Sequence, residues 1–139
     1  MLSDAREIAR LNGELGYSAC SKSAETNLLA IISSENHAVM VCEKSAGHIL
    51  GWIVVEKRIS LETGEKAEIT GLVVDPCARR KGIGKALVLA AEQWAQKNGL
   101  YKIVVRSNAA RAESHQFYES LAYVRGKTQH YYSKHYASI

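Results

Sequence analysis

The residues with the clearest chemical potential lie between positions 73 and 86, where a β-branched run gives way to a basic loop and two glycines. Four cations fall within seven residues, at Arg79, Arg80, Lys81 and Lys85. Gly82 and Gly84 follow and open a helical pattern. Free N–H groups at a helix start favour an anion, and glycines let phosphate oxygens approach the backbone. The segment therefore predicts a phosphate site, the alternative being a capped turn with incidental cations.

Two common nucleotide-binding motifs do not fit this segment. The dinucleotide fingerprint GxGxxG needs a third glycine, and Leu87 stands in its place. The nucleoside-triphosphate motif GxxxxGK[ST] is matched at its end by residues 126–128, but Leu121 occupies the position of its first glycine. The expected phosphate ligand is therefore neither NAD nor ATP.

The elements that must position this loop follow from hydrophobic periodicity. It predicts helices over 3–16, 23–34, 82–97 and 112–121, and strands over 37–43, 49–60, 67–75, 101–106 and from Tyr123 through the aromatic residues 130–136. Gly71, inside a strand, indicates a bulge or a close backbone approach. The order ααβββαβαβ predicts an α+β fold with a mixed sheet, in which antiparallel hairpins lead into a strand–helix–strand unit.

Length and composition exclude several classes of protein. The 139 residues and 15.3 kDa fit a single domain over 1–139, and 47% hydrophobic with 23% charged residues argues against disorder. No apolar run approaches the ~20 residues of a membrane span. We expect no secretory signal, because no basic segment and apolar core follow Met1. Three widely spaced cysteines, Cys20, Cys42 and Cys77, predict neither a disulfide scaffold nor a zinc site and fit a reducing cytoplasm.

The segment Arg79-x-x-Gly82-x-Gly84 resembles the pyrophosphate-binding motif [RQ]xxGx[GA] of the GNAT superfamily of N-acetyltransferases. A second segment, from Phe117 to Tyr123, resembles the family's FYxxLGF/Y pattern, with Ala122 where glycine is usual. The resemblance covers nearly the whole chain and is closest to small bacterial members, such as aminoglycoside 6'-N-acetyltransferases and aminoalkylphosphonate N-acetyltransferases. It implies the GNAT fold, a central mixed sheet flanked by helices in which two neighbouring parallel strands splay apart.

The resemblance implies acetyl-CoA as co-substrate and no metal. Acetyl-CoA would lie between strands 67–75 and 101–106, with its pantetheine arm paired to the strand backbone and the Leu72 amide polarising the thioester carbonyl. The pyrophosphate would bind the amides from Arg80 to Lys85, while Arg79 orders the loop. The implied cofactor-binding residues are Leu72, Val73, Val74, Arg79, Arg80, Lys81, Gly82, Ile83, Gly84, Lys85, Asn108 and Tyr118.

Two residues take catalytic roles by the same resemblance. Tyr118 matches the tyrosine that protonates the departing thiolate; the alternative is a core tyrosine beside Phe117. Glu68 matches a strand glutamate that acts as general base, often through water; the alternative is an ion pair with a hairpin lysine. Glu68 precedes Leu72 by four residues, so we expect the two on one strand face. Asn108 either contacts pantetheine or caps a helix.

The reaction implied is direct attack of a small-molecule amine on acetyl-CoA in a ternary complex, without an acyl-enzyme. Acetylation of a protein N-terminus or lysine, and non-catalytic acyl-CoA binding, remain alternatives. Nucleic-acid binding is disfavoured because no aromatic residues interleave the basic cluster, and no membrane partner is expected. The tail 130–136 would cover the acceptor site or form a homodimer contact, and Trp52 would pack in the core or wall the acceptor cleft.

Overall fold

The computed structural model describes residues 21–45, 48–78, 82–106, 112–127 and 129–136. Contacts divide the chain into two compact units, residues 1–106 and 107–139, which are described separately below. The single domain expected from the length stays a prediction.

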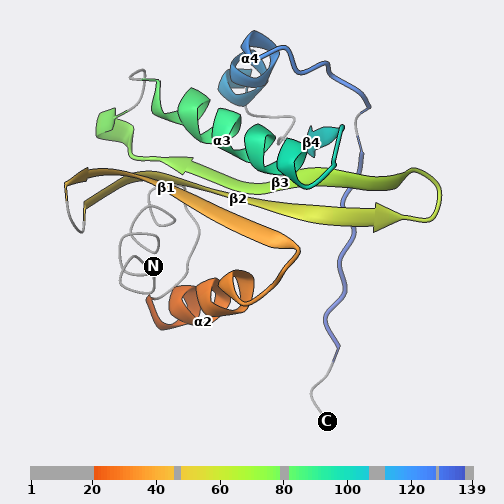
Figure 1. The fold of residues 1–139 in the computed structure, drawn as a ribbon, viewed down its shortest axis with the longest axis horizontal. Helices are drawn as coiled ribbons and strands as arrows, with labels where there is room; N and C mark the ends of the chain where they lie inside the picture. Colours follow the sequence, from red (N-terminus) through yellow and green to blue (C-terminus); the bar gives the residue numbers. More distant parts are fainter. Residues whose placement is uncertain (1–20, 46–47, 79–81, 107–111, 128, 137–139) are drawn as a thin grey trace. The chain divides into compact units, whose positions relative to one another are not determined.

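The first unit is built on a mixed four-stranded sheet (Figure 1). Its elements are α2 (Ser21–Ile32), β1 (His37–Ser45), β2 (His48–Ser60), β3 (Gly64–Val74), a 3₁₀ turn (Pro76–Ala78), α3 (Ile83–Lys97) and β4 (Ile103–Val105). The strand order is β1-β2-β3-β4, with β1–β2 and β2–β3 antiparallel and β3–β4 parallel. The mixed sheet predicted from the sequence is confirmed.

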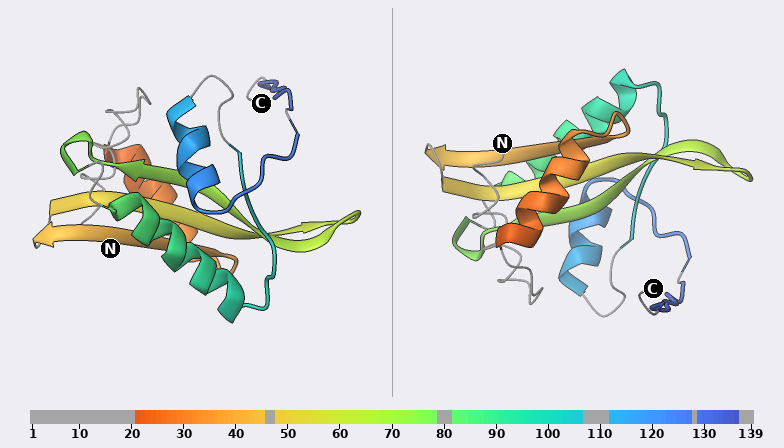
Figure 2. Two further views of the ribbon diagram at one scale, coloured as in Figure 1. Left: turned by 90° about the horizontal axis from the view of Figure 1, so that it is seen from above. Right: turned by 90° about the horizontal axis from the view of Figure 1, so that it is seen from below.

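Helices cover both faces of this sheet, α3 on one and α2 on the other (Figures 1 and 2). α3 buries an apolar stripe at helical spacing that includes Leu87, Ala91 and Ala95. On the other face, Leu28 of α2 packs against Val39 and Trp52. Each face of the sheet therefore has its own apolar contact layer.

Gly51 of β2 lets α3 approach the sheet closely. A Cβ at this position would lie 2.9 Å from the Val73 carbonyl oxygen, 3.2 Å from Leu87 Cδ1 and 3.3 Å from Ile83 Cγ2. The start of α3 therefore packs directly over the sheet backbone, and any side chain at Gly51 would displace it.

A β-bulge interrupts the pairing of β2 with β3. Val54 pairs with Gly71 and Val55 with Ile69, so Thr70 is an extra residue on β3. The Thr70 hydroxyl donates to the Val54 carbonyl oxygen at 3.5 Å. The bulge expected at the internal glycine of this strand is confirmed.

The bulge glycine makes room for an indole ring. A Cβ on Gly71 would lie 2.7 Å from a ring carbon of Trp52. Because Trp52 packs against Leu28, its core-packing interpretation is the one supported.

The second unit contains α4 (Ala112–Ser120). The helices expected over 23–34, 82–97 and 112–121 are each confirmed to within two residues, and the helix expected over 3–16 lies outside the described residues.

The final predicted strand is wrong, because residues 123–127 and 129–136 form no strand. Three of their tyrosines, Tyr131, Tyr132 and Tyr136, are exposed, with Tyr131 at 89% and Tyr136 at 86%. Alternation along a sequence produces a strand only where a neighbouring backbone pairs with it and one face is buried.

Candidate functional site

The edge of β3 toward β4 is paired along only part of its length. The parallel ladder joins Ala67 to Ile103 and ends where Ile69 meets Val105. β3 itself runs on to Val74. The described pairing of the two parallel strands therefore covers three residue pairs, and the splay implied by the resemblance stays a prediction.

The backbone direction along the unpaired edge follows from one hydrogen bond. Asp75 N–H donates to the Leu50 carbonyl at 2.7 Å, so Asp75 presents its main-chain groups to β2. The N–H and C=O groups of successive strand residues point alternately to the two neighbouring strands, so those of Leu72 and Val74 point toward the β4 side. Among the described residues they have no ladder partner there. This edge can accept an extended ligand as an added strand, as a pantetheine arm requires.

The start of α3 offers an anion site close in sequence to this edge. Its N-cap, Gly82, is left-handed (φ 78°, ψ 9°) and has no side chain to cap the helix. The first intrahelical bond comes from Ala86 N–H, 3.0 Å from the Gly82 carbonyl, so the N–H groups of Ile83, Gly84 and Lys85 have no intrahelical acceptor. The first turn carries no acidic residue. These amides therefore suit a pyrophosphate.

The remaining predicted loop cations, Arg79, Arg80 and Lys81, lie outside the described residues, as does Asn108. Their roles stay predictions. The structure describes Leu72, Val73 and Val74 at the end of β3 and Gly82 to Lys85 at the start of α3, and the Val73 carbonyl and the Ile83 side chain both lie beside Gly51.

Glu68 is a buried carboxylate in the middle of the sheet. Only 6% of the residue is exposed. Its Oε2 lies 3.4 Å from Arg58 Nη1, whereas Oε1 is buried and makes no hydrogen bond within the described part of the chain. The cross-strand ion pair weighed from the sequence exists, but its partner is Arg58 and not a lysine. A buried carboxylate oxygen without a donor is costly and calls for an explanation.

Glu68 and Leu72 do not share a strand face, contrary to expectation. Glu68 pairs with Glu56 and Leu72 pairs with Ile53, and these two β2 positions differ by an odd number, so their side chains face opposite ways. The extra residue Thr70 causes the inversion. Glu68 therefore lies on the face covered by α2, and Leu72 on the face covered by α3.

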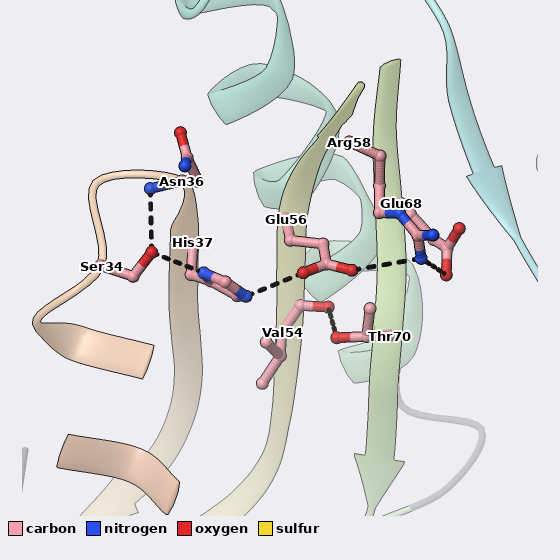
Figure 3. A network of polar contacts seen from close by, with 8 residues as sticks. All are labelled: Ser34, Asn36, His37, Val54, Glu56, Arg58, Glu68 and Thr70. Carbon is pink, nitrogen blue, oxygen red and sulfur yellow. Dashed lines mark hydrogen bonds and ion pairs between the residues drawn. The ribbon is translucent and has the colours of Figure 1, made fainter. Parts of the chain in front are cut away.

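A chain of polar contacts crosses the sheet on the α2 face (Figure 3). Arg58 Nη1 bridges two carboxylates, Oε1 of Glu56 at 3.5 Å and Oε2 of Glu68 at 3.4 Å. The other oxygen of Glu56 lies 2.8 Å from Nε2 of His37, whose Nδ1 lies 2.8 Å from the Ser34 hydroxyl. This network of polar contacts therefore connects the turn after α2 with Glu68, the candidate base.

The direction of the His37–Glu56 contact follows from the carboxylate. A carboxylate only accepts hydrogen bonds, so Nε2 of His37 carries the hydrogen that meets Glu56. On the other side of the ring, the Ser34 hydroxyl contacts Nδ1 and accepts from Asn36 N–H at 3.2 Å.

Sequence reasoning missed His37, Glu56 and Arg58. Glu56 and Arg58 alternate along β2, which is the only signal that they share a face. Their meeting with Glu68 depends on the β2–β3 register, which the bulge sets.

Tyr118 belongs to the second unit, on α4. Its ring makes edge-on contacts with Phe117 at 5.0 Å and with Tyr123 at 5.7 Å between centroids. Burial raises the pKa of Tyr118 above its ordinary value of 10.0. The phenol is thus fully protonated near neutral pH, as a proton donor must be, and its role at the thiolate stays a prediction.

The end of α4 is closed by Ala122 in a left-handed conformation, with φ 70°. Ala122 N–H donates to the Glu119 carbonyl at 3.1 Å and Tyr123 N–H donates to the Tyr118 carbonyl at 3.0 Å. These bonds form a Schellman motif, and the Tyr118–Tyr123 ring contact is its accompanying apolar pair.

The described residues contain no group of three or more His, Cys, Asp or Glu side chains placed to hold a metal ion. Nor does any described helix have the length and apolarity needed to cross a bilayer.

The family to which this chain belongs follows from a match over most of its length. Residues 4–123 match the acetyltransferase (GNAT) family. The chain belongs to this family. The assignment agrees with the resemblance carried by the 79–84 and 117–123 segments.

Individual GNAT relatives match over shorter stretches. The uncharacterised N-acetyltransferase YhdJ of Bacillus subtilis is 39% identical over 61 residues, covering 44% of this chain and 43% of that protein. An aminoglycoside N(6')-acetyltransferase type 1 of Klebsiella aerogenes is 40% identical over 65 residues, covering 45% and 43%. This chain thus spans less than half the length of these two relatives.

Solved GNAT structures share the fold over nearly the whole chain. An aminoglycoside N-acetyltransferase in complex with CoA superposes with a TM-score of 0.84 at 16% identity, covering 95% of this chain and 89% of that one. The apo aminoglycoside 6'-N-acetyltransferase of Acinetobacter haemolyticus gives 0.77 at 19% identity, covering 96% and 94%. The GNAT fold expected from the sequence is confirmed.

Proposed function

We propose that this GNAT-family protein is an acetyl-CoA-dependent N-acetyltransferase that acetylates an amine of a small molecule by direct attack in a ternary complex. The observation that carries the proposal is the succession of two ligand-binding features along the chain. The open edge of β3 at Leu72 and Val74 suits the pantetheine arm, and the uncapped start of α3 at Gly82 suits the pyrophosphate.

The chemistry needs three contributions from the chain. The acceptor ammonium first loses a proton to Glu68, through a water because Glu68 Oε1 is buried from solvent. The amine nitrogen then attacks the thioester carbon while the Leu72 N–H stabilises the developing oxyanion. The C–S bond breaks as the amide forms, the thiolate takes a proton from Tyr118, and the proton that the nitrogen loses on becoming an amide restores the Tyr118 hydroxyl.

The class of acceptor is supported by the relatives, which include an aminoglycoside acetyltransferase. The alternatives are a protein N-terminus or lysine as acceptor, and acyl-CoA binding without catalysis.

Two measurements test this function. Acetyl-CoA should raise the melting temperature of the protein, whereas ATP and NAD should not. Free thiol release should then be followed with a panel of aminoglycosides, polyamines, aminophosphonates and peptides. Equal stabilisation by ATP would refute the cofactor site. Turnover of peptides alone would replace the small-molecule acceptor, and tight acetyl-CoA binding with no turnover would favour the binding module.

The base is tested by Glu68→Gln, which keeps the size of the side chain and removes its basicity. Acetyl-CoA binding should survive, while turnover falls at neutral pH and recovers in part at higher pH, where the amine is deprotonated in solution. An unchanged pH–rate profile would assign the base to water or another carboxylate and reduce Glu68 to an ion-pair residue.

Location and assembly belong to the same proposal. A cytoplasmic location is supported by Cys42 and Cys77, which are free thiols. A homodimer is the further expectation, to be tested by the mass of the protein in solution.

A further inference from the structure

The charged side chains on the α2 face, Glu56, Arg58 and Glu68, carry more charge than a base alone requires. Glu68 and Glu56 are direct cross-strand partners, and like charges in that position repel. Their side chains are only 8% and 20% exposed, so water screens them weakly. One guanidinium nitrogen, Arg58 Nη1, serves both carboxylates. The two acids therefore compete for a single cation.

The contacts of each carboxylate are unequal. Glu56 is held at both oxygens, by Arg58 and by His37. Glu68 is held at Oε2 alone, and its buried Oε1 has no donor among the described residues. Arg58 thus holds one oxygen of Glu68 and leaves the other without a donor.

We propose that Arg58 and Glu56 are positioning residues that set, with opposite sign, the pH at which Glu68 accepts a proton. The inference rests on the proposed function, in which Glu68 is the base. Arg58 favours the charged carboxylate and Glu56 disfavours it. Arg58 also holds the carboxylate in one orientation, while His37 and Ser34 hold Glu56 from the far side.

Other charges near Glu68 do not change these signs. Lys66 precedes Glu68 by two residues on β3, and Lys102 and Arg106 flank Val104, the β4 residue paired with Glu68. All three are cations and stay in place in every variant below. The part of α2 whose side chains are described, residues 26–32, carries no charge.

The test follows the side-chain carboxyl signal of Glu68 by carbon-13 NMR in the full chain labelled with [¹³C]glutamate. Glu68→Gln identifies the signal by its disappearance. In Arg58→Gln, Glu68 should hold its proton to a higher pH than in the parent, and in Glu56→Gln it should lose its proton at a lower pH than in the parent. Arg58→Lys, which keeps the charge, should restore most of the parent titration.

A matched control lies next in sequence. Lys57 follows Glu56 on β2, so its side chain faces away from Glu68, and it pairs with Glu65 at 3.3 Å. Lys57→Gln removes the same charge from the opposite face and should leave the Glu68 titration in place. A general effect of lost charge or stability would move the signal in this variant as well.

Opposite shifts in the Arg58 and Glu56 variants support the proposal. Shifts of the same sign, no shift in either, or an equal shift in Lys57→Gln overturn it. If Arg58→Gln does not fold, Arg58→Met, which removes the same charge, takes its place beside Glu56→Gln. Because the titration uses no acceptor, failure of the amine panel would refute the proposed function without touching this result.

Discussion

Ala122→Gly should stabilise the protein, because Ala122 holds a left-handed backbone that an L side chain disfavours. At φ 70° the Cβ crowds the neighbouring carbonyl, at a cost of roughly 1–2 kcal/mol that glycine does not incur. Glycine loses more backbone entropy on folding, by about 0.5–1 kcal/mol. The net gain is about 0.5–1 kcal/mol, taken from those two ranges.

The assay is hydrogen exchange at the Tyr123 amide, which donates to the Tyr118 carbonyl across this turn. A gain of about 1 kcal/mol corresponds to exchange slower by roughly five-fold. α3 supplies a matched control, because its end has the same two bonds, Gly99 N–H to Gln96 at 3.1 Å and Leu100 N–H to Ala95 at 2.9 Å.

In α3 the left-handed position already holds glycine, with φ 73° at Gly99. Gly99→Ala should therefore speed exchange of the Leu100 amide by a similar factor. Unchanged or faster exchange at Tyr123 in Ala122→Gly would refute the argument from backbone strain, as would a neutral Gly99→Ala.

Further predictions concern the cofactor site, the acid and the core. Gly82→Glu should abolish acetyl-CoA binding in calorimetry, while Gly82→Asn, which tolerates the left-handed φ, should retain it. Tyr118→Phe should lower turnover by a factor near the low end of about 10²–10⁴, while the affinity for acetyl-CoA stays within a few-fold of the parent value. If the variant keeps the parent turnover when the chemical step is rate-limiting, Tyr118 has a packing role only. Because burial raises the pKa of Tyr118, this residue contributes stability that is present below pH 10.0 and is lost as the pH rises through its pKa in the folded state. Denaturant unfolding of Tyr118→Phe at alkaline pH should not show this loss. Gly51→Ala should cost about 2 kcal/mol in urea unfolding, because the new methyl meets the Val73 carbonyl, whereas Gly126→Ala, in open space, should be neutral.

Sequence reasoning succeeded where the signal is local. The start of α3 depends on the run of Gly82 and Gly84 after a strand, and the bulge depends on Gly71 inside one; both are visible without tertiary knowledge. The motif around Tyr118 likewise sits on the predicted helix. The terminal aromatic segment failed because alternation was the only evidence, and a strand also needs a partner backbone.

The arrangement around Glu68 could not be predicted because it depends on register. Counting four residues from Glu68 to Leu72 assumes an uninterrupted pleat, and Thr70 breaks that assumption. The same uncertainty hid Arg58, whose pairing with Glu68 is fixed only once the extra residue is placed. Gly71 indicates that a bulge exists, but it does not show on which face of the sheet the side chains before and after the bulge lie.

The bulge makes the arrangement of β3 depend on the number of residues between Glu68 and Leu72, which substitutions leave unchanged. Before Thr70, β3 places the Glu68 carboxylate on the α2 face, and after it, β3 presents main-chain groups at the open edge. A substitution at Thr70 would keep the number of residues between these two positions, and with it their relative orientation. Deleting it would turn the Glu68 carboxylate toward the apolar residues beneath α3 while the downstream backbone stayed in place. A substitution between positions 68 and 72, other than at Gly71, keeps this register, whereas the gain or loss of one residue moves Glu68 to the other face of the sheet relative to the open edge.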